Sequence, residues 1–157
     1  MVRKDIVKLV SGIRSDKAGY FDKALREMRE ILPASIKMHD RTTAEKLVAE
    51  AVRAYWYWDE RVPRTKNWEK LTGKKLEEFV AGREEMRRRR DAVMELLMLA
   101  REAADHLRVV AHGDKKKHGL SVKIVRTVDA CEMEWQLIAE KRVAEGEMGG
   151  KWVVRIG

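Results

Sequence analysis

Hydrophobic residues recur at helical spacing through most of the chain, and the longest such pattern runs from Lys75 to His112. No proline interrupts it, and apolar residues return every three or four positions, which predicts one helix of about 75–112. At about 1.5 Å per residue this helix would be roughly 55 Å long. Its middle is almost without apolar residues and contains four consecutive arginines, so the pattern predicts a long rod with a basic middle.

Shorter amphipathic helices are predicted before the rod. The first spans Val2–Ile13 and ends near Gly12, and the second spans Lys17–Leu32 and is ended by Pro33. A third begins at a capping residue, for which Asp40, Thr42 and Thr43 are candidates. It runs to residue 62, and residues 64–74 then form a linker.

After Gly119 the hydrophobic pattern changes. Apolar and polar residues alternate between Cys131 and Val143, which predicts a strand, although Ala, Glu and Lys also make a helix over 129–145 possible. Lys151–Ile156 is predicted to be a closing strand. The expected fold is therefore mainly α, with helical hairpins, one very long helix and a small C-terminal antiparallel β meander. Two regions are expected: a helical nucleic-acid-binding and assembly region, 1–119, and a β-rich tail, 120–157.

Four consecutive aromatic residues occupy the end of the third predicted helix. Four successive helical positions span roughly 300°, so these side chains cannot all face one core. Packing against another element or subunit is one interpretation, and a platform for stacking bases is the other. Together with the tryptophan of the linker they are the predicted assembly contacts: Tyr55, Trp56, Tyr57, Trp58 and Trp68.

The charge balance indicates a polyanionic partner. The 157 residues carry a formal net charge of +8, an excess that favours binding to nucleic acid. Asn67 is the only asparagine and Gln136 the only glutamine, while Lys, Arg and Glu are abundant. This composition is typical of proteins from hyperthermophiles. Cys131 is the only cysteine, so no intrachain disulfide is expected.

Catalytic and cofactor motifs are missing from the sequence. It contains no P-loop, no GxSxG, no HExxH and no GxGxxG. We therefore expect no enzyme, no cofactor and no metal site, although Glu132 and Glu134 on one face of a strand could in principle hold a divalent ion for a nuclease. No apolar run is long enough for a membrane span. A virion, or otherwise the cytoplasm, is the expected location.

The arginine run is the most specific feature of the charge pattern. Its planar guanidinium groups suit phosphate oxygens, although the pairs Glu84–Arg88 and Glu85–Arg89 also fit a solvated helix face. Because Asn and Gln are almost missing, the chain is poor in base-reading chemistry, and sequence-independent backbone binding is favoured. The candidate nucleic-acid contacts are Arg3, Lys4, Lys8, Arg14, Arg64, Lys66, Lys70, Lys74, Lys75, Arg83, Arg87, Arg88, Arg89, Arg90, Lys115, Lys116 and Lys117, of which the last three are expected in an exposed loop.

In its small size, its long helix with Arg87–Arg90 and its composition, the chain resembles coat proteins of filamentous and rod-shaped viruses of hyperthermophilic archaea. The resemblance implies a helical subunit, often one of a pair of paralogues, that wraps double-stranded DNA. The β-like tail departs from that pattern. The expected function is a structural protein that coats double-stranded DNA and self-assembles. The alternatives are a transcriptional regulator with a variant helix-turn-helix and a metal-dependent nuclease or DNA-packaging enzyme.

Overall fold

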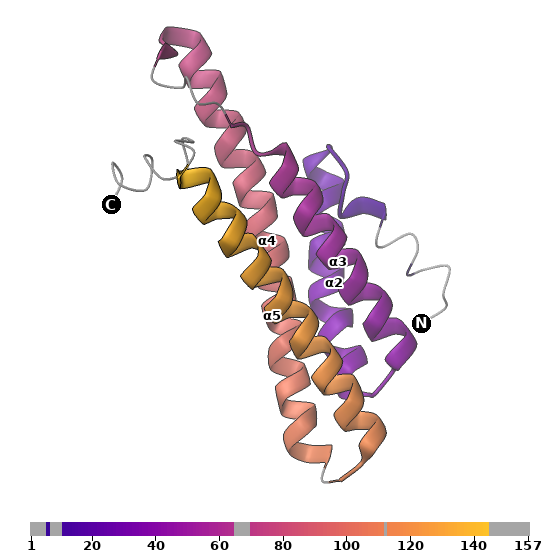
Figure 1. Cartoon of the computed structure of the whole chain (residues 1–157). Coiled ribbons are helices and arrows are strands. Elements are labelled where there is room, and N and C mark those ends of the chain that lie inside the picture. The colour runs from indigo at the N-terminus through magenta and orange to yellow at the C-terminus, as the bar shows by residue number, and fades with distance from the viewer. Residues whose placement is uncertain (1–5, 7–10, 65–69, 112, 145–157) are drawn as a thin grey trace.

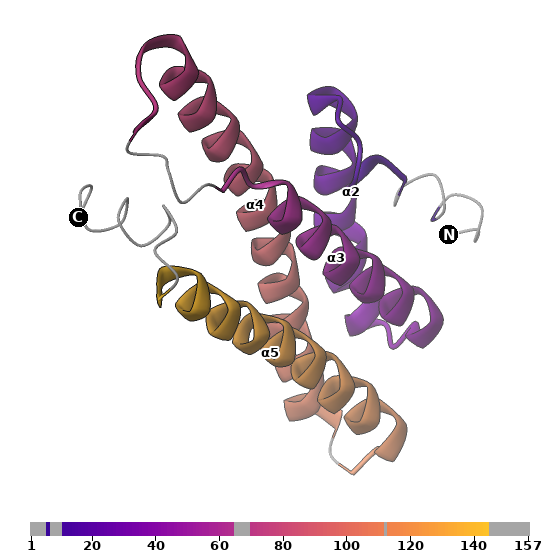
Figure 2. The same cartoon turned by 45° about the horizontal axis from the view of Figure 1, so that its top comes forward.

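The chain forms a bundle of long helices around one central helix. The computed structural model describes residue 6 and residues 11–64, 70–111 and 113–144. These residues contain α2 (Ala18–Lys37), α3 (Arg41–Arg61), α4 (Gly73–Ala111) and α5 (Lys115–Ala144). α4 packs against each of the other three, with α2 and α3 together on one side and α5 on another (Figures 1 and 2).

The long rod is confirmed. α4 has 39 residues, which at about 1.5 Å each gives roughly 58 Å. Its first turns extend beyond the other helices (Figure 1). Gly113, with φ of 86°, follows its C-terminal end, because a left-handed conformation there is adopted at least cost by glycine.

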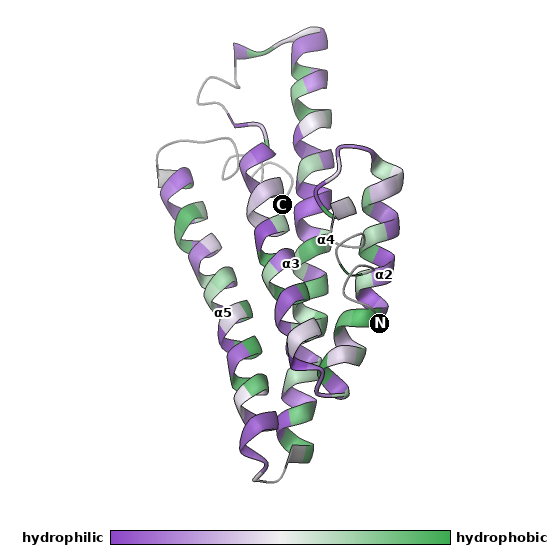
Figure 3. Cartoon of the chain, turned by 90° about the vertical axis from the view of Figure 1, so that its right-hand side faces the viewer, coloured by the Kyte–Doolittle hydropathy of each residue, from purple (hydrophilic) through white to green (hydrophobic). Residues whose placement is uncertain are grey.

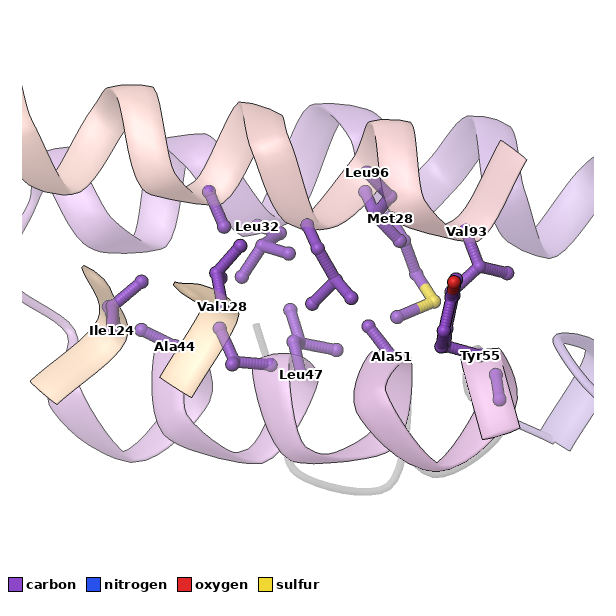
Figure 4. Close-up of a cluster of buried hydrophobic side chains, with 14 of the residues drawn as sticks. Met28, Leu32, Ala44, Leu47, Ala51, Tyr55, Val93, Leu96, Ile124 and Val128 are labelled. Carbon is purple, nitrogen blue, oxygen red and sulfur yellow. The ribbon is translucent and has the colours of Figure 1, made fainter. Parts of the chain in front are cut away.

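One hydrophobic core is shared by the four helices. Figure 4 shows side chains of α2, α3, α4 and α5 meeting in it. Since α5 contributes to this core, the described part of the expected C-terminal region packs directly onto the helical region. Its labelled members are Met28, Leu32, Ala44, Leu47, Ala51, Tyr55, Val93, Leu96, Ile124 and Val128.

The predicted end of the second helix at Pro33 is wrong, because Pro33 lies inside α2. Proline removes one backbone hydrogen bond from a helix, but the turn that follows it is anchored by burial of Ser35 and Ile36. The link to α3 is therefore only residues 38–40. Asp40 caps α3 by accepting a hydrogen bond from the Thr43 amide at 3.3 Å, which confirms one of the three predicted capping residues.

The predicted C-terminal β meander is wrong in the part of the tail that the structure describes. Residues 115–144 form α5, and the closing strand 151–156 lies outside the described residues. The apparent alternation is the sum of two helical rows. Cys131 and Trp135 are four residues apart and face inward, whereas Met133 and Leu137 are four apart and exposed. Residues 115–117, expected in a loop, form the first turn of the helix, where Asp114 Oδ1 accepts hydrogen bonds from the amides of Lys116 and Lys117.

The N-terminal approach to α2 is held by close contacts. Ile6 and Ile13 are buried, and Trp58 Nε1 donates a 2.9 Å hydrogen bond to the carbonyl of Ile13. A Cβ at Gly12 would lie 2.9 Å from the carbonyl oxygen of Tyr20, so only glycine fits this approach without movement of backbone. The rest of the predicted helix Val2–Ile13 lies mostly outside the described residues.

Candidate nucleic-acid interface

The four arginines in the middle of α4 point in different directions. Arg89 and Arg90 are buried, whereas Arg88 is exposed and Arg87 is half-buried. Arg88 donates to both carboxylate oxygens of Glu85, at 2.9 and 3.1 Å. No ion pair of Arg87 is found among the described residues. The run therefore presents two of its four guanidinium groups to solvent.

Arg89 is used inside the protein. Its guanidinium group lies over the ring of Trp58 at 4.6 Å and over that of Phe21 at 5.4 Å. It donates hydrogen bonds to the carbonyl oxygens of Ser15 and Asp16, at 2.9 and 3.1 Å. Together with the hydrogen bond from its Nε to Glu85 Oε1 at 3.0 Å, these contacts stabilise the buried cation and attach the turn before α2 to α4.

Arg90 belongs to a buried group centred on one carboxylate, which we call the Asp59 cluster: Asp59, Arg64, Arg90, Trp135 and Arg142. Arg90 Nη1 and Arg64 Nη2 each lie 3.0 Å from Asp59 Oδ1. Arg142 Nη2 lies 3.1 Å from Asp59 Oδ2, and the indole of Trp135 donates to Oδ1 at 3.1 Å. The cluster thus joins α3, α4, α5 and the segment after α3 at one point.

The charge state of Asp59 follows from this arrangement. Burial by itself would raise its pKa, but hydrogen bonds and charges from Arg142, Arg64 and Arg90 together lower the pKa below the ordinary value of 3.8. Asp59 is therefore ionised at neutral pH. The arginines around it balance a buried negative charge, which is a structural role.

The outer side of α4 is acidic once the buried arginines are set aside. Between residues 84 and 102 its exposed charged side chains are Glu84, Arg88, Asp91, Glu95 and Glu102. Four of these five are negative, and the remaining one is paired with Glu85. The basic middle of the sequence is thus not a basic surface in the fold, and we do not place a phosphate contact there.

The outer side of α2 is basic, and its three cations are not among the contacts predicted from the sequence. Lys23, Arg26 and Lys37, which we call the α2 outer row, are exposed and have no ion pair among the described residues. With Glu30 they are three, four and seven residues apart, so they share one side of the helix. This helical spacing is the signal that could have identified them.

An aromatic side chain lies at the start of the same helix. Tyr20 is 59% exposed, and Lys17 Nζ lies 5.5 Å from its ring. Tyr20 lies one turn before Lys23, the first cation of the α2 outer row, so the N-terminal part of α2 offers a ring and cations to a phosphate backbone.

The other candidate contacts are scattered. Arg14 is exposed and lies 3.8 Å from Glu50, and Arg83 is buried and donates to the carbonyl of Pro63 at 3.0 Å. The remaining exposed lysines lie at the two ends of α4, about 58 Å apart by its length. One group is Lys70, Lys74 and Lys75, and the other is Lys115, Lys116 and the half-buried Lys117. Arg3, Lys4, Lys8 and Lys66 lie outside the described residues.

The aromatic run divides between core and surface. Tyr55 and Trp58 are buried, and their neighbours Trp56 and Tyr57 are half-buried. Tyr57 also has the guanidinium group of Arg61 4.3 Å from its ring. The run therefore packs mainly within the subunit, which leaves little of it for an assembly contact, and Trp68 lies outside the described residues.

The structure also shows how the two glutamates considered as a metal site are placed. Glu132 and Glu134 lie on a helix, where residues two apart point about 200° away from each other, so they do not converge on one ion. The described residues include no group of three or more His, Cys, Asp or Glu side chains placed to hold a metal. Within that same part of the chain, every helix is too short or too polar to cross a bilayer.

Comparison with known proteins identifies no family for this chain. No protein-family model, no curated protein and no solved structure matches this chain.

Proposed function

We propose that this chain is a structural protein that coats double-stranded DNA by binding its phosphate backbone without reading the bases. The α2 outer row, together with Lys17 and Tyr20, forms the binding surface. The observation that carries the proposal is the separation of charge between helices. Three of the four arginines at 87–90 are buried or paired with a carboxylate, whereas Lys23, Arg26 and Lys37 of α2 are exposed and without ion pairs among the described residues.

The residue types of this surface favour backbone contacts over base contacts. Lysine acts as a mobile point charge, and bidentate recognition of a base edge commonly uses arginine, asparagine or glutamine. The α2 outer row offers only one arginine, and neither amide residue lies on α2. Lys23 and Lys37 are fourteen residues apart, or about 21 Å along the helix, which is long enough to follow several phosphates of one strand.

A coat protein must also cover the nucleic acid with many copies of itself. The net charge of +8 and the elongated bundle suit a subunit that neutralises many phosphates while neighbouring copies contact each other. This is the role that the resemblance to viral coat proteins implies.

The test is binding of the full chain to duplexes of unrelated sequence at several salt concentrations. The variant Lys23→Gln/Arg26→Gln/Lys37→Gln removes three charges from α2. Two matched variants each remove three charges elsewhere: Lys70→Gln/Lys74→Gln/Lys75→Gln and Lys115→Gln/Lys116→Gln/Lys117→Gln. We expect the α2 variant to flatten the plot of log affinity against log salt by about two to three units, with a much smaller change in the two matched variants.

Two outcomes would contradict the proposal. Equal losses in all three variants would show diffuse attraction by net charge, and a marked preference for one sequence would favour a regulator. Electron microscopy with and without linear DNA provides a second readout, in which a coat protein produces long regular particles only when DNA is present.

A further inference from the structure

α5 has a second hydrophobic row that lies exposed in the part of the chain that the structure describes. Its inner row, including Ile124, Val128 and Cys131, is buried against the bundle. On the other side, Met133 and Leu137 are 64% and 62% exposed. Two large apolar side chains four residues apart form a continuous surface rather than isolated exposed residues.

The exposed row has the spacing of a helix-pairing seam. We call it the α5 stripe: Arg126, Ala130, Met133, Leu137 and Glu140. Its members are exposed and are separated by four, three, four and three residues. That repeat is the one by which two helices pack along a shared line. In Figure 3, α5 forms an edge of the bundle, with the other helices along one side of it.

We propose that the α5 stripe is a dimer interface, in which it packs antiparallel against the same stripe of a second copy of this chain. Met133 lies at the two-fold axis. Arg126 and Glu140 are each seven residues from Met133, one before it and one after it. Antiparallel pairing therefore places Arg126 opposite Glu140 of the partner subunit, and the symmetry repeats this ion pair at the other end.

The charges at the two ends of the α5 stripe favour a second copy as the partner and an antiparallel direction of pairing. A parallel pair would place Arg126 beside Arg126 of the partner subunit, which is repulsive. Neither Arg126 nor Glu140 forms an ion pair among the described residues, so both are available in the bundle as it stands. Because the stripe is complementary to itself, a second copy satisfies it without any other protein.

The contact is small. Its apolar part consists of Ala130, Met133 and Leu137, so we expect a reversible dimer that forms with rising protein concentration. This dimer provides the self-association that is part of the proposed function. The dimer itself does not depend on that function, because it involves no nucleic acid.

The hydrophobic part of the interface is tested with two matched substitutions on α5. Leu137→Glu places a charge on the stripe. Val143→Glu places the same charge at an exposed apolar position, 53% accessible, on a different side of the helix. Sedimentation equilibrium of the full chain, without nucleic acid, should show a monomer–dimer equilibrium for the wild type and for Val143→Glu, and a monomer for Leu137→Glu. Circular dichroism verifies that the variants keep their helices.

The direction of pairing is tested by exchanging the charges. Arg126→Glu and Glu140→Arg should each weaken the dimer about tenfold or more, because each places like charges together at both ends. The double variant Arg126→Glu/Glu140→Arg restores opposite charges only in the antiparallel arrangement, and its dimer should recover to near the wild-type affinity. Failure of that recovery would overturn the antiparallel geometry.

Two further results would overturn the interface itself. They are a wild type that stays monomeric at every concentration, and equal effects of Leu137→Glu and Val143→Glu. Since none of these measurements contains DNA, they can fail while the α2 outer row still binds a duplex, and the reverse also holds. The two proposals are therefore tested separately.

Discussion

Arg90 and Asp59 form a buried ion pair, with Arg90 Nη1 3.0 Å from Asp59 Oδ1 and side chains 7% and 1% exposed. The pair joins the middle of α4 to the end of α3. Arg90 also donates from Nε to Asp91 at 3.0 Å and lies 4.9 Å from the ring of Trp135. The arginine that the sequence offers as a phosphate contact thus connects three helices of its own subunit.

Removing the carboxylate of this pair should be strongly destabilising. In Asp59→Ala, the buried Arg90 keeps its charge and loses its main partner, and breaking a buried pair from one side costs about 3–5 kcal/mol of unfolding free energy. Chemical denaturation followed by circular dichroism measures the change. The control Glu95→Ala breaks the exposed pair of Arg29 and Glu95, at 3.1 Å, and should cost less than about 1 kcal/mol. Similar costs for both variants would contradict the role given to Asp59.

Acid should unfold the protein partly through the same carboxylate. The pKa of Asp59 is lower in the folded chain than its ordinary value of 3.8. A carboxyl group with a lowered pKa stabilises the fold above its unfolded pKa and loses that contribution as the pH falls through the folded one. We therefore expect the unfolding free energy to fall below about pH 4.

Glu85 adds to this acid dependence. Its pKa is lowered to about 2, chiefly by the hydrogen bond from Arg88. Because Glu85 is more exposed than Asp59, Glu85→Gln should remove a smaller part of the acid dependence than Asp59→Asn. Urea titrations of the three proteins between pH 2 and 7 would show this order, and the reverse order would count against a dominant role of the buried cluster.

The sequence contained enough information to place the arginines, although the sequence analysis did not use it. Arg90 continues the row Val93, Leu97 and Ala100, and Arg89 continues the row of Val93 and Leu96, at spacings of three and four. Positions that extend a buried row are expected to be buried. What local pattern cannot supply is the partner, because Asp59 lies 31 residues away and is brought close only by packing of α3 on α4.

The error over α5 has a different origin. A strand pattern of alternating apolar and polar residues can be distinguished from a helical pattern only when one side of the element is polar. In α5 both the inner row at Cys131 and the outer row at Met133 are apolar, so their sum has a period of two. The buried row is explained by packing against α4. The exposed row has no packing partner among the residues that the structure describes, which is why we assign it to a second copy.

Arg87 and Arg88, the two arginines of the run at 87–90 that reach solvent, should matter little for DNA binding. Arg87 and Arg88 are surrounded on their surface by Glu84 and Asp91, and Arg88 is already bound to Glu85. Changing both arginines to alanine should alter duplex affinity by less than about threefold, against a loss of an order of magnitude or more for the α2 variant. Fluorescence anisotropy with labelled duplex gives both values. A larger loss of affinity in the α4 variant would indicate that the long helix, and not α2, forms the binding surface.

The turn between α2 and α3 contains a removable strain. His39 has φ of 55°, a left-handed conformation that glycine adopts at lower cost. We expect His39→Gly to increase the unfolding free energy by about 0.5–1 kcal/mol. Gly113→Ala provides the reverse control, because φ there is 86° and a Cβ would meet nothing within 4 Å, so its cost is conformational. If both changes shift stability in the same direction, backbone conformation does not explain them.

The thiol of Cys131 can report how α5 is held to the bundle. Cys131 is buried on the inner row, and burial, with nearby negative charges led by Glu134, raises its pKa to about 11 from an ordinary 9.0. At pH 8 the thiolate, which is the reactive form, is therefore about a hundredfold scarcer than in an exposed cysteine. Labelling of the native protein by a thiol reagent should accordingly be slow and should become fast in denaturant.

Arg142 should control that rate. It joins the C-terminal half of α5 to Asp59, and Arg142→Ala removes this link while leaving Cys131 unchanged. Local opening of α5 then becomes easier, and we expect labelling to accelerate several-fold with little change in the helical signal. The neighbouring Lys141→Ala alters an exposed side chain without an ion pair among the described residues, and should leave the rate unchanged. Equal rates in the two variants would mean that Arg142 does not hold α5, and that the apolar row and the hydrogen bond from Trp135 to Asp59 are sufficient.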